Sequence, residues 1–162
     1  MPTIAVTGHM DLTDDTVPLV KDALRTLLAA YPPADLVGIS CIAAGSDALF
    51  AEVVLEAGGR LVVVIPSRDY RRNKVQPAHA ATFDWLVAEA AEVHTVPHET
   101  ANREAYEAAN KVLLERADRL VAVWNGAPPS GKGGGTADVV VEAREAGLAV
   151  DVVWPDGAVR RG

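Results

Sequence analysis

A chain of 162 residues has the length of one ordinary domain, and its content of 49% hydrophobic and 23% charged residues is typical of a globular protein. The net charge of -7 argues against a nucleic-acid surface, because phosphate backbones attract basic patches. This net charge is compatible with a local site that binds a small phosphorylated ligand. No apolar run approaches the roughly 18 residues that span a bilayer, so we expect no membrane partner.

Cysteine usage and the N-terminus both predict a cytoplasmic protein. Cys41 is the single cysteine, so no internal disulfide forms, which fits a reducing compartment. The first residues enter a strand pattern at once, with no basic segment or signal-like apolar stretch.

In chain order, short β-branched runs alternate with longer helical patterns. Strands are predicted over residues 3–8, 35–40, 60–65, 118–124 and 149–154, with a further short strand over 92–96. Helices are predicted over residues 13–31, 45–58, 78–91, 102–117 and 136–147, and a long polar connection occupies 66–78.

The strands are apolar without interruption, which indicates a sheet covered on both faces. Together with the strand–helix alternation, this predicts an α/β fold: a three-layer, doubly wound, mainly parallel sheet. Residues 1–155 are expected to form a single domain, and residues 156–162 a short, loose C-terminal tail.

Ligands bind such sheets beyond the carboxyl ends of the strands. Four segments leave strands at that edge: residues 7–11, 40–47, 65–72 and 124–138. We expect them to converge on one site.

The last of these segments contains Gly133, Gly134, Gly135 and Thr136 directly before a helix. Free N–H groups at a helix N-terminus bind anions, and glycine lets a phosphate lie against the backbone, while Thr136 is positioned to cap the helix. A slack loop with an ordinary Thr cap is the alternative. Lys132 precedes the glycines, so the segment does not match a P-loop, and it also lacks the spacing and position of the first-strand dinucleotide fingerprint.

Two further turns also place a glycine at or after the end of a strand, at the edge where ligands bind such sheets. Gly45 allows a tight turn, Ser46 is placed as an N-cap, and Asp47 lies in the first helical turn, although a well-capped helix explains these residues equally well. Gly8 ends the first strand and permits close approach to the backbone, and His9 is either a ligand contact or a surface turn histidine.

Asn110 continues an apolar helix face with Tyr106 and Leu113, so it is either a ligand contact or a satisfied structural amide. Arg68 begins a basic run that is either solvated surface or a phosphate-binding lid. Cys41 is more simply a buried small residue than a nucleophile with His9 as its base. No His, Cys or Asp spacing suggests a metal, and no cofactor is expected.

These segments together resemble the SLOG superfamily of Rossmann-like nucleotide-binding proteins, which includes the LOG-type phosphoribohydrolases. The resemblance is carried by "GISCIAAGSDALFAE", "ADRLVAVWNG" and "GGGTADVVVEAREAG", and "TGHMD" also looks like members of this group. Nucleoside 2-deoxyribosyltransferases share a similar C-terminal arrangement. The resemblance implies a nucleotide or nucleotide-derived ligand over the three glycine-containing turns.

The resemblance also implies a catalytic carboxylate. LOG-type enzymes have an acid after the threonine that assists cleavage of the N-glycosidic bond, and Asp138 falls near that position. Their arginine on the preceding helix has no counterpart here, since the matching position is Ala109 or Asn110. Hydrolysis would therefore need Arg103 or Arg68 as the substitute cation.

The sequence thus favours a protein that binds a nucleotide or a related phosphorylated ligand. A LOG-like phosphoribohydrolase that releases the base from a nucleoside 5′-monophosphate is the alternative. A non-catalytic sensing or assembly protein is a third reading. The alanine-rich helices over 78–91 and 102–117 are suited to packing against a second copy, so a homodimer or higher homo-oligomer is expected.

Overall fold

The computed structural model describes residues 2–131 and 135–161. Its strands are β1 (Thr3–Gly8), β2 (Val37–Ser40), β3 (Arg60–Ile65), β4 (Glu92–Thr95), β5 (Arg119–Val123) and β6 (Ala149–Val153). Its helices are α1 (Thr16–Leu28), α2 (Ser46–Glu56), α3 (Tyr70–Asn73), α4 (Pro77–Glu89), α5 (Arg103–Arg116) and α6 (Thr136–Glu145). In these described ranges, no helix is both long and apolar enough to cross a membrane.

The strands form one sheet in the order β4-β3-β2-β1-β5-β6, and every neighbouring pair is parallel. The centre of the sheet is fully apolar: Ile4 and Val6 on β1 and Val121 on β5 have at most 1% of their surface exposed. Unbroken β-branched runs such as these are stable only when helices cover both faces.

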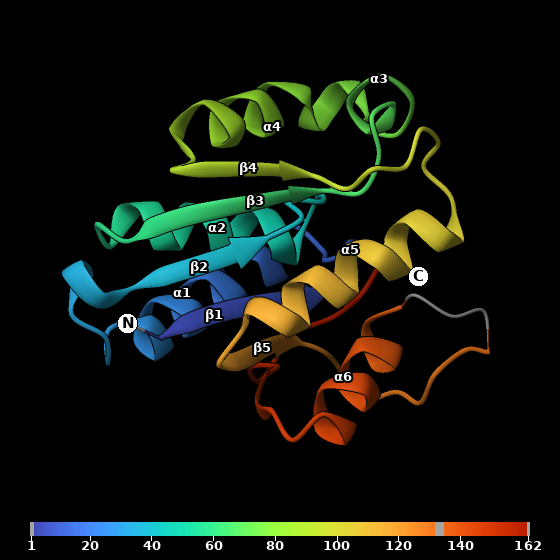
Figure 1. Cartoon of the computed structure of the whole chain (residues 1–162). Coiled ribbons are helices and arrows are strands. Elements are labelled where there is room, and N and C mark those ends of the chain that lie inside the picture. The colour runs from blue at the N-terminus through green and yellow to red at the C-terminus, as the bar shows by residue number, and fades with distance from the viewer. Residues whose placement is uncertain (1, 132–134, 162) are drawn as a thin grey trace.

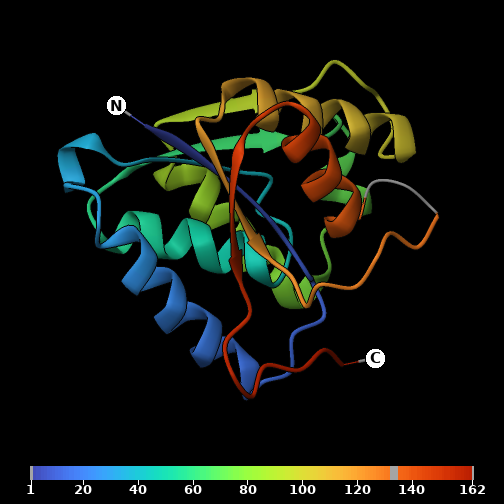
Figure 2. The same ribbon diagram turned by 90° about the horizontal axis from the view of Figure 1, so that it is seen from below.

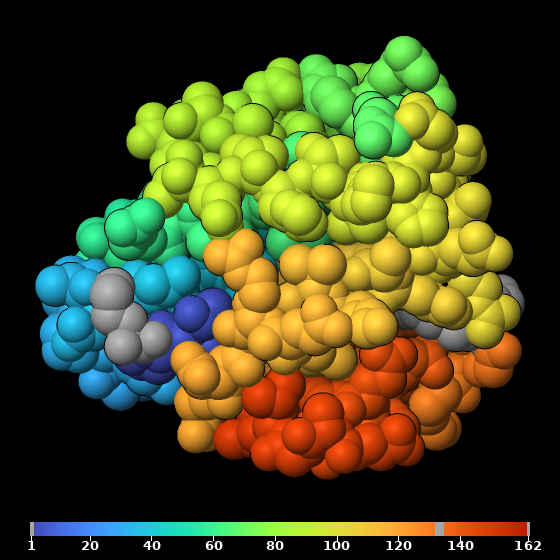
Figure 3. Space-filling view, in the orientation of Figure 1, coloured from blue at the N-terminus to red at the C-terminus, as the bar shows by residue number. Residues whose placement is uncertain are grey.

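Helices do cover both faces, as Figure 1 shows. On one face, α1 packs against α2, and α2 packs on β1, β2 and β3 and contacts α4. On the other face, α5 and α6 pack on β1, and their side chains (yellow and orange-red) cover the sheet in Figure 3. The predicted three-layer, doubly wound α/β fold is therefore confirmed, with a sheet that is parallel throughout its described strands.

The strand order reverses at β1. The chain moves outward from β1 through β2 and β3 to β4, and then returns to the other side of β1 with β5 and β6. Helices that leave β1 and β5 therefore lie on opposite faces, which opens a crevice between the carboxyl ends of these two strands.

The observed boundaries of several elements differ from the predicted ones by a few residues. The first helix begins at Thr16 rather than at residue 13, and a 3-10 turn over Pro33–Asp35 replaces the start of the second predicted strand. The connection over 66–78 contains the short helix α3, which the sequence pattern did not predict.

The prediction of a loose tail is wrong. The backbone N–H of Val159 donates to Oγ1 of Thr16 (2.8 Å), and Arg161 donates to the backbone carbonyl of Leu12 (2.9 Å). Figure 2 shows this C-terminal segment, in dark red, beside the start of α1. Thr16 is fully buried, so the tail is fixed by satisfied polar contacts that the sequence pattern does not reveal.

Candidate functional site

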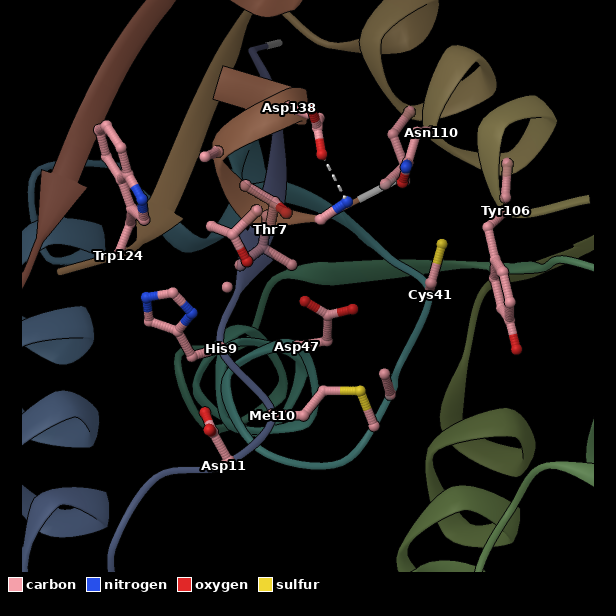
Figure 4. Close-up of a pocket in the computed structure, with 18 of the residues that line it drawn as sticks. Thr7, His9, Met10, Asp11, Cys41, Asp47, Tyr106, Asn110, Trp124 and Asp138 are labelled. Carbon is pink, nitrogen blue, oxygen red and sulfur yellow. Dashed lines mark hydrogen bonds between the residues drawn. The ribbon is translucent and has the colours of Figure 1, made fainter. Parts of the chain in front are cut away.

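A pocket of about 590 Å³ lies where β1, β2 and β5 end and where α5 and α6 form the walls. Figure 4 shows its labelled side chains around one hollow. Among the predicted site residues, the pocket brings together Gly8, His9, Asp47, Asn110, Gly135, Thr136 and Asp138. The predicted residues Gly133 and Gly134 lie outside the described ranges.

The glycines at two of the converging turns are needed by the fold itself. A Cβ on Gly8 would lie 2.5 Å from Cβ of Ser46 and 2.8 Å from Cβ of Val123. Gly45 has a φ of +84°, and a Cβ there would lie 2.7 Å from the carbonyl oxygen of Met10. The close approach at both glycines is therefore between segments of the chain, and Gly45 does not line the pocket.

Ser46 is not the N-cap that the sequence suggested, because Gly45 holds that position. Oγ of Ser46 instead donates to the backbone carbonyl of His9 (2.7 Å), and Ser46 is fully buried. The first turn of α2 is thus bonded to the loop after β1, which fixes the floor of the pocket.

His9 connects the loop after β1 to a third segment, the end of β5 and the residues that follow it. Its backbone N–H donates to the carbonyl of Val123 (3.1 Å), and its Nε2 accepts from the backbone N–H of Asn125 (3.1 Å). Its ring stands edge-on to Trp154, with 5.5 Å between ring centroids. Burial, reinforced by the charge of Arg160, lowers the pKa of His9, so the imidazole is neutral and accepts at Nε2.

Asp47 is a partly buried acid that lines the pocket. Its carboxylate points into the hollow beneath Thr7 in Figure 4. Oδ1 is buried, and no atom in the described part of the chain is its hydrogen-bond partner. Burial raises the pKa of Asp47 to about 7, and the backbone N–H of Ala43 offsets this only in part.

Cys41 lies on the same wall and is unsuited to be a nucleophile. Burial raises the pKa of its thiol, and the neighbouring charge of Asp47 adds to the effect. Since the thiolate is the reactive form, the thiol stays unreactive at neutral pH. The interpretation of Cys41 as a buried small residue agrees with this environment.

The start of α6 forms the upper wall. Gly135, not Thr136, is the N-cap, and Asp138 accepts a hydrogen bond from the Gly135 backbone N–H at Oδ2 (3.0 Å; dashed in Figure 4). Asp138 faces the pocket while it satisfies one of the unpaired N–H groups of its own helix. A capping role therefore competes with the predicted catalytic role.

α5 supplies the wall opposite Trp124. Asn110 lines the pocket together with Tyr106 and Leu113, which lie one turn away on the same helix face. The indole of Trp124 is held in place, because its Nε1–H donates to the carbonyl of Ala127 (3.0 Å). The aromatic side chains of Tyr106 and Trp124 and the amide of Asn110 therefore line the same pocket as Asp47 and Asp138.

The basic side chains at the pocket are not the predicted ones. Arg68 pairs with Glu99, Arg103 pairs with Glu107 (2.8 Å), and neither lines the pocket. Lys74 and Arg160 line it instead.

Arg160 contacts Asp11 through a hydrogen bond of 2.8 Å between Nε and Oδ1. Neither cation was predicted as a site residue: Lys74 ends the basic run that begins at Arg68, and Arg160 lies in the C-terminal tail.

The pocket thus combines cationic groups, the carboxylates of Asp47 and Asp138 and aromatic walls. Its volume is within the range of roughly 300–1,000 Å³ that small-molecule sites occupy. Over residues 2–131 and 135–161, no group of three or more His, Cys, Asp or Glu side chains could hold a metal ion.

No family model matches the sequence, and no curated protein is similar to it in sequence at a significant level. Solved structures are similar to it in fold. DNA processing protein A (DprA) from Streptococcus pneumoniae superposes with a TM-score of 0.69 at 18% identity, over 97% of this chain and 52% of that chain. This chain therefore spans about half the length of that protein.

Two further structures have the same fold. The DprA of Helicobacter pylori, described for its single-stranded DNA binding mode, gives a TM-score of 0.65 at 16% identity, covering 98% of this chain and 68% of its own. The molybdenum cofactor carrier protein of Chlamydomonas reinhardtii gives 0.55 at 17% identity, with 93% and 75% covered. These similarities, all at 18% identity or less, show that the chain shares its fold with these proteins.

Proposed function

We propose that this protein binds a nucleotide or nucleotide-derived small molecule in the pocket at the carboxyl edge of the sheet. The observation that carries the proposal is the convergence, around one 590 Å³ hollow, of three strand ends with two basic side chains and an unpaired buried carboxylate oxygen. A ligand with an anionic group, hydrogen-bond donors and a flat ring matches this combination.

The polar groups of the pocket give such a ligand an orientation. Its anionic group lies toward Arg160 and Lys74, and the N-terminus of α6 adds the positive end of the helix dipole. Its ring packs against Trp124 or Tyr106, which offer apolar faces at the walls. Arg160 thereby supplies a cation that the sequence analysis assigned to Arg103 or Arg68.

An N-glycosidase activity is the second candidate. It is favoured by the position of Asp138 in the pocket, where a carboxylate is available to stabilise an oxocarbenium-like state. For this role Asp138 has to release the Gly135 N–H, to which it is bonded in this structure.

The test of binding is a thermal-shift panel of AMP, GMP, ribose 5-phosphate and a short single-stranded DNA oligonucleotide. The oligonucleotide is included because the structure of Helicobacter pylori DprA is described for its binding of single-stranded DNA. We expect at least one nucleotide to raise the melting temperature and Arg160→Ala to reduce that shift. A panel in which no probe shifts the wild-type protein contradicts the proposal.

The test of catalysis is chromatography of the free base after incubation with AMP and GMP. Base release that Asp138→Asn abolishes supports the hydrolase. If AMP or GMP binds and no free base appears, the result supports the binding function and contradicts the N-glycosidase activity.

A further inference from the structure

Asp47, which lines the pocket, has a carboxylate oxygen without a hydrogen-bond partner in the described residues. Oδ1 is buried without a partner in the described residues, although the side chain borders a cavity. A buried acceptor left unpaired costs about 1–3 kcal/mol, so such atoms are rare in folded proteins. The fold of α2 holds the side chain there, because Ser46 and Gly45 fix the first turn of that helix.

The surroundings of Asp47 do not supply a countercharge. Cys41 after β2 and Tyr70 on α3 interact with the charge of Asp47, and both are neutral at pH 7. His9, Asp11 and Arg160 line the same pocket, where His9 is neutral and Arg160 is paired with Asp11. Asp138 and Lys74 line the same pocket, but no ion pair of the described residues includes Asp47. The remaining source of a partner is a molecule that enters the pocket.

We infer that the ligand of this pocket donates a hydrogen bond to Oδ1 of Asp47 and that Asp47 loses its proton when the ligand binds. The inference rests on the proposed function and specifies it: the ligand must carry an O–H or N–H donor, which selects against ligands that present only acceptors at this position. The donor is a ribose hydroxyl or a ring N–H of the base, which share this chemistry.

Proton release follows from the environment of the carboxylate. In the free protein the pKa of Asp47 is raised to about 7, so about half of the molecules hold the proton at pH 7. A donor in the pocket stabilises the charged form and lowers this pKa. Binding at pH 7 therefore releases up to about half a proton per ligand, and affinity rises as the pH increases from 6 to 8.

The experiment is isothermal titration calorimetry at pH 7 in two buffers of different ionisation enthalpy, which gives the number of protons released. The probes are AMP, 2′-deoxy-AMP, GMP and ribose 5-phosphate. Asp47→Asn is compared with the wild type for each probe, because the phosphate itself titrates with a second pKa of about 6 and that contribution cancels in the difference. Asp84→Asn is the matched control, since Asp84 is an exposed acid paired with Arg71.

We expect Asp47→Asn to abolish the release attributable to the protein and Asp84→Asn to leave it unchanged. Loss of the release with 2′-deoxy-AMP alone identifies the ribose hydroxyl as the donor. Loss with ribose 5-phosphate alone identifies the base. Equal proton release and equal affinity in wild type and Asp47→Asn overturn the inference, whereas absence of binding by every probe overturns the proposed function instead.

Discussion

At the scale of single residues, burial acts on two neighbours of the pocket in opposite directions. It raises the pKa of Asp47 to about 7 and lowers the pKa of His9, because a low-dielectric environment disfavours the charged form of each. At pH 7, His9 is therefore neutral and Asp47 is protonated in about half of the molecules, which reduces the negative charge that Asp47 brings to the pocket.

Replacing Asp47 by Asn is expected to stabilise the unliganded protein at high pH. A group whose folded pKa is raised contributes stability that is present below its unfolded pKa, near 3.8, and lost as the pH rises through about 7. The variant lacks this loss, so its advantage should be about 1–3 kcal/mol at pH 8 and should shrink toward pH 4. Urea unfolding at both pH values measures it; an advantage independent of pH contradicts the assignment.

Replacing His9 by Phe should destabilise the protein at pH 7.5 by about 1–3 kcal/mol, because the backbone N–H of Asn125 loses its acceptor. The folded pKa of His9 is lowered below 6.5, so its contribution is fully present above pH 6.5 and is lost as the pH falls through the folded pKa. The penalty of the substitution should therefore be smaller at pH 5. Unfolding curves at the two pH values give the difference, and a penalty that grows on acidification refutes this account.

At the scale of elements, the glycine-containing turns that resemble one another in sequence differ in physical role. Gly45 has a left-handed backbone and no space for a side chain, so the turn before α2 depends on it. Gly135 has a φ of -82°, and a Cβ there would meet nothing closer than Oδ2 of Asp138 at 3.5 Å. The packing of the chain does not require a glycine at position 135, where glycine is also a favoured N-cap residue, so ligand approach to this backbone stays a prediction.

Replacing Gly135 by Ala separates these roles. We expect a loss of at most about 1 kcal/mol in unfolding free energy, the usual effect at an N-cap, together with a tenfold or greater loss of affinity for the nucleotide found in the thermal-shift panel. Gly45→Ala is the contrasting variant and should unfold at a clearly lower temperature. Unchanged affinity in Gly135→Ala would mean that no ligand group lies against this backbone.

At the scale of the whole molecule, the C-terminal segment returns to the connection between β1 and α1, beside the pocket and away from the N-terminus (Figure 2). Arg160 reaches the pocket wall because β6 ends near the start of α1, where Thr16 and Leu12 hold the tail. At the opposite edge of the sheet, beside the otherwise polar strand β4, two apolar side chains are exposed: Trp85 on α4 (47%) and Val93 on β4 (42%). This edge is the place at which we expect a second copy to pack.

The homodimer is tested by light scattering. We expect the wild-type protein to have twice the chain mass and Trp85→Glu to have the chain mass, because a buried charge at the interface is costly. Val141→Glu, at an equally exposed position on α6, should leave the mass unchanged. A monomeric wild type at micromolar concentration contradicts the expectation.

The elements that the sequence predicted well are those whose signals are local. The unbroken apolar run at 60–65 corresponds to β3 as predicted, and the carboxyl-edge rule correctly nominated segments that meet at the pocket. Capping was misassigned at Ser46 and Thr136, because the preceding glycines, Gly45 and Gly135, hold the N-cap positions. The hydroxyl of Ser46 donates instead to the backbone carbonyl of His9.

By itself, the sequence determined the layer architecture and the edge of the sheet at which the pocket lies, since both follow from periodicity and from the direction of parallel strands. Only the tertiary structure decided which cations reach that edge: Arg160 replaced Arg68 and Arg103 at the pocket. It also decided that Asp47 is left without a partner. Contacts between distant segments set the burial of a charge and its neighbours, and no local pattern in the chain carries that information.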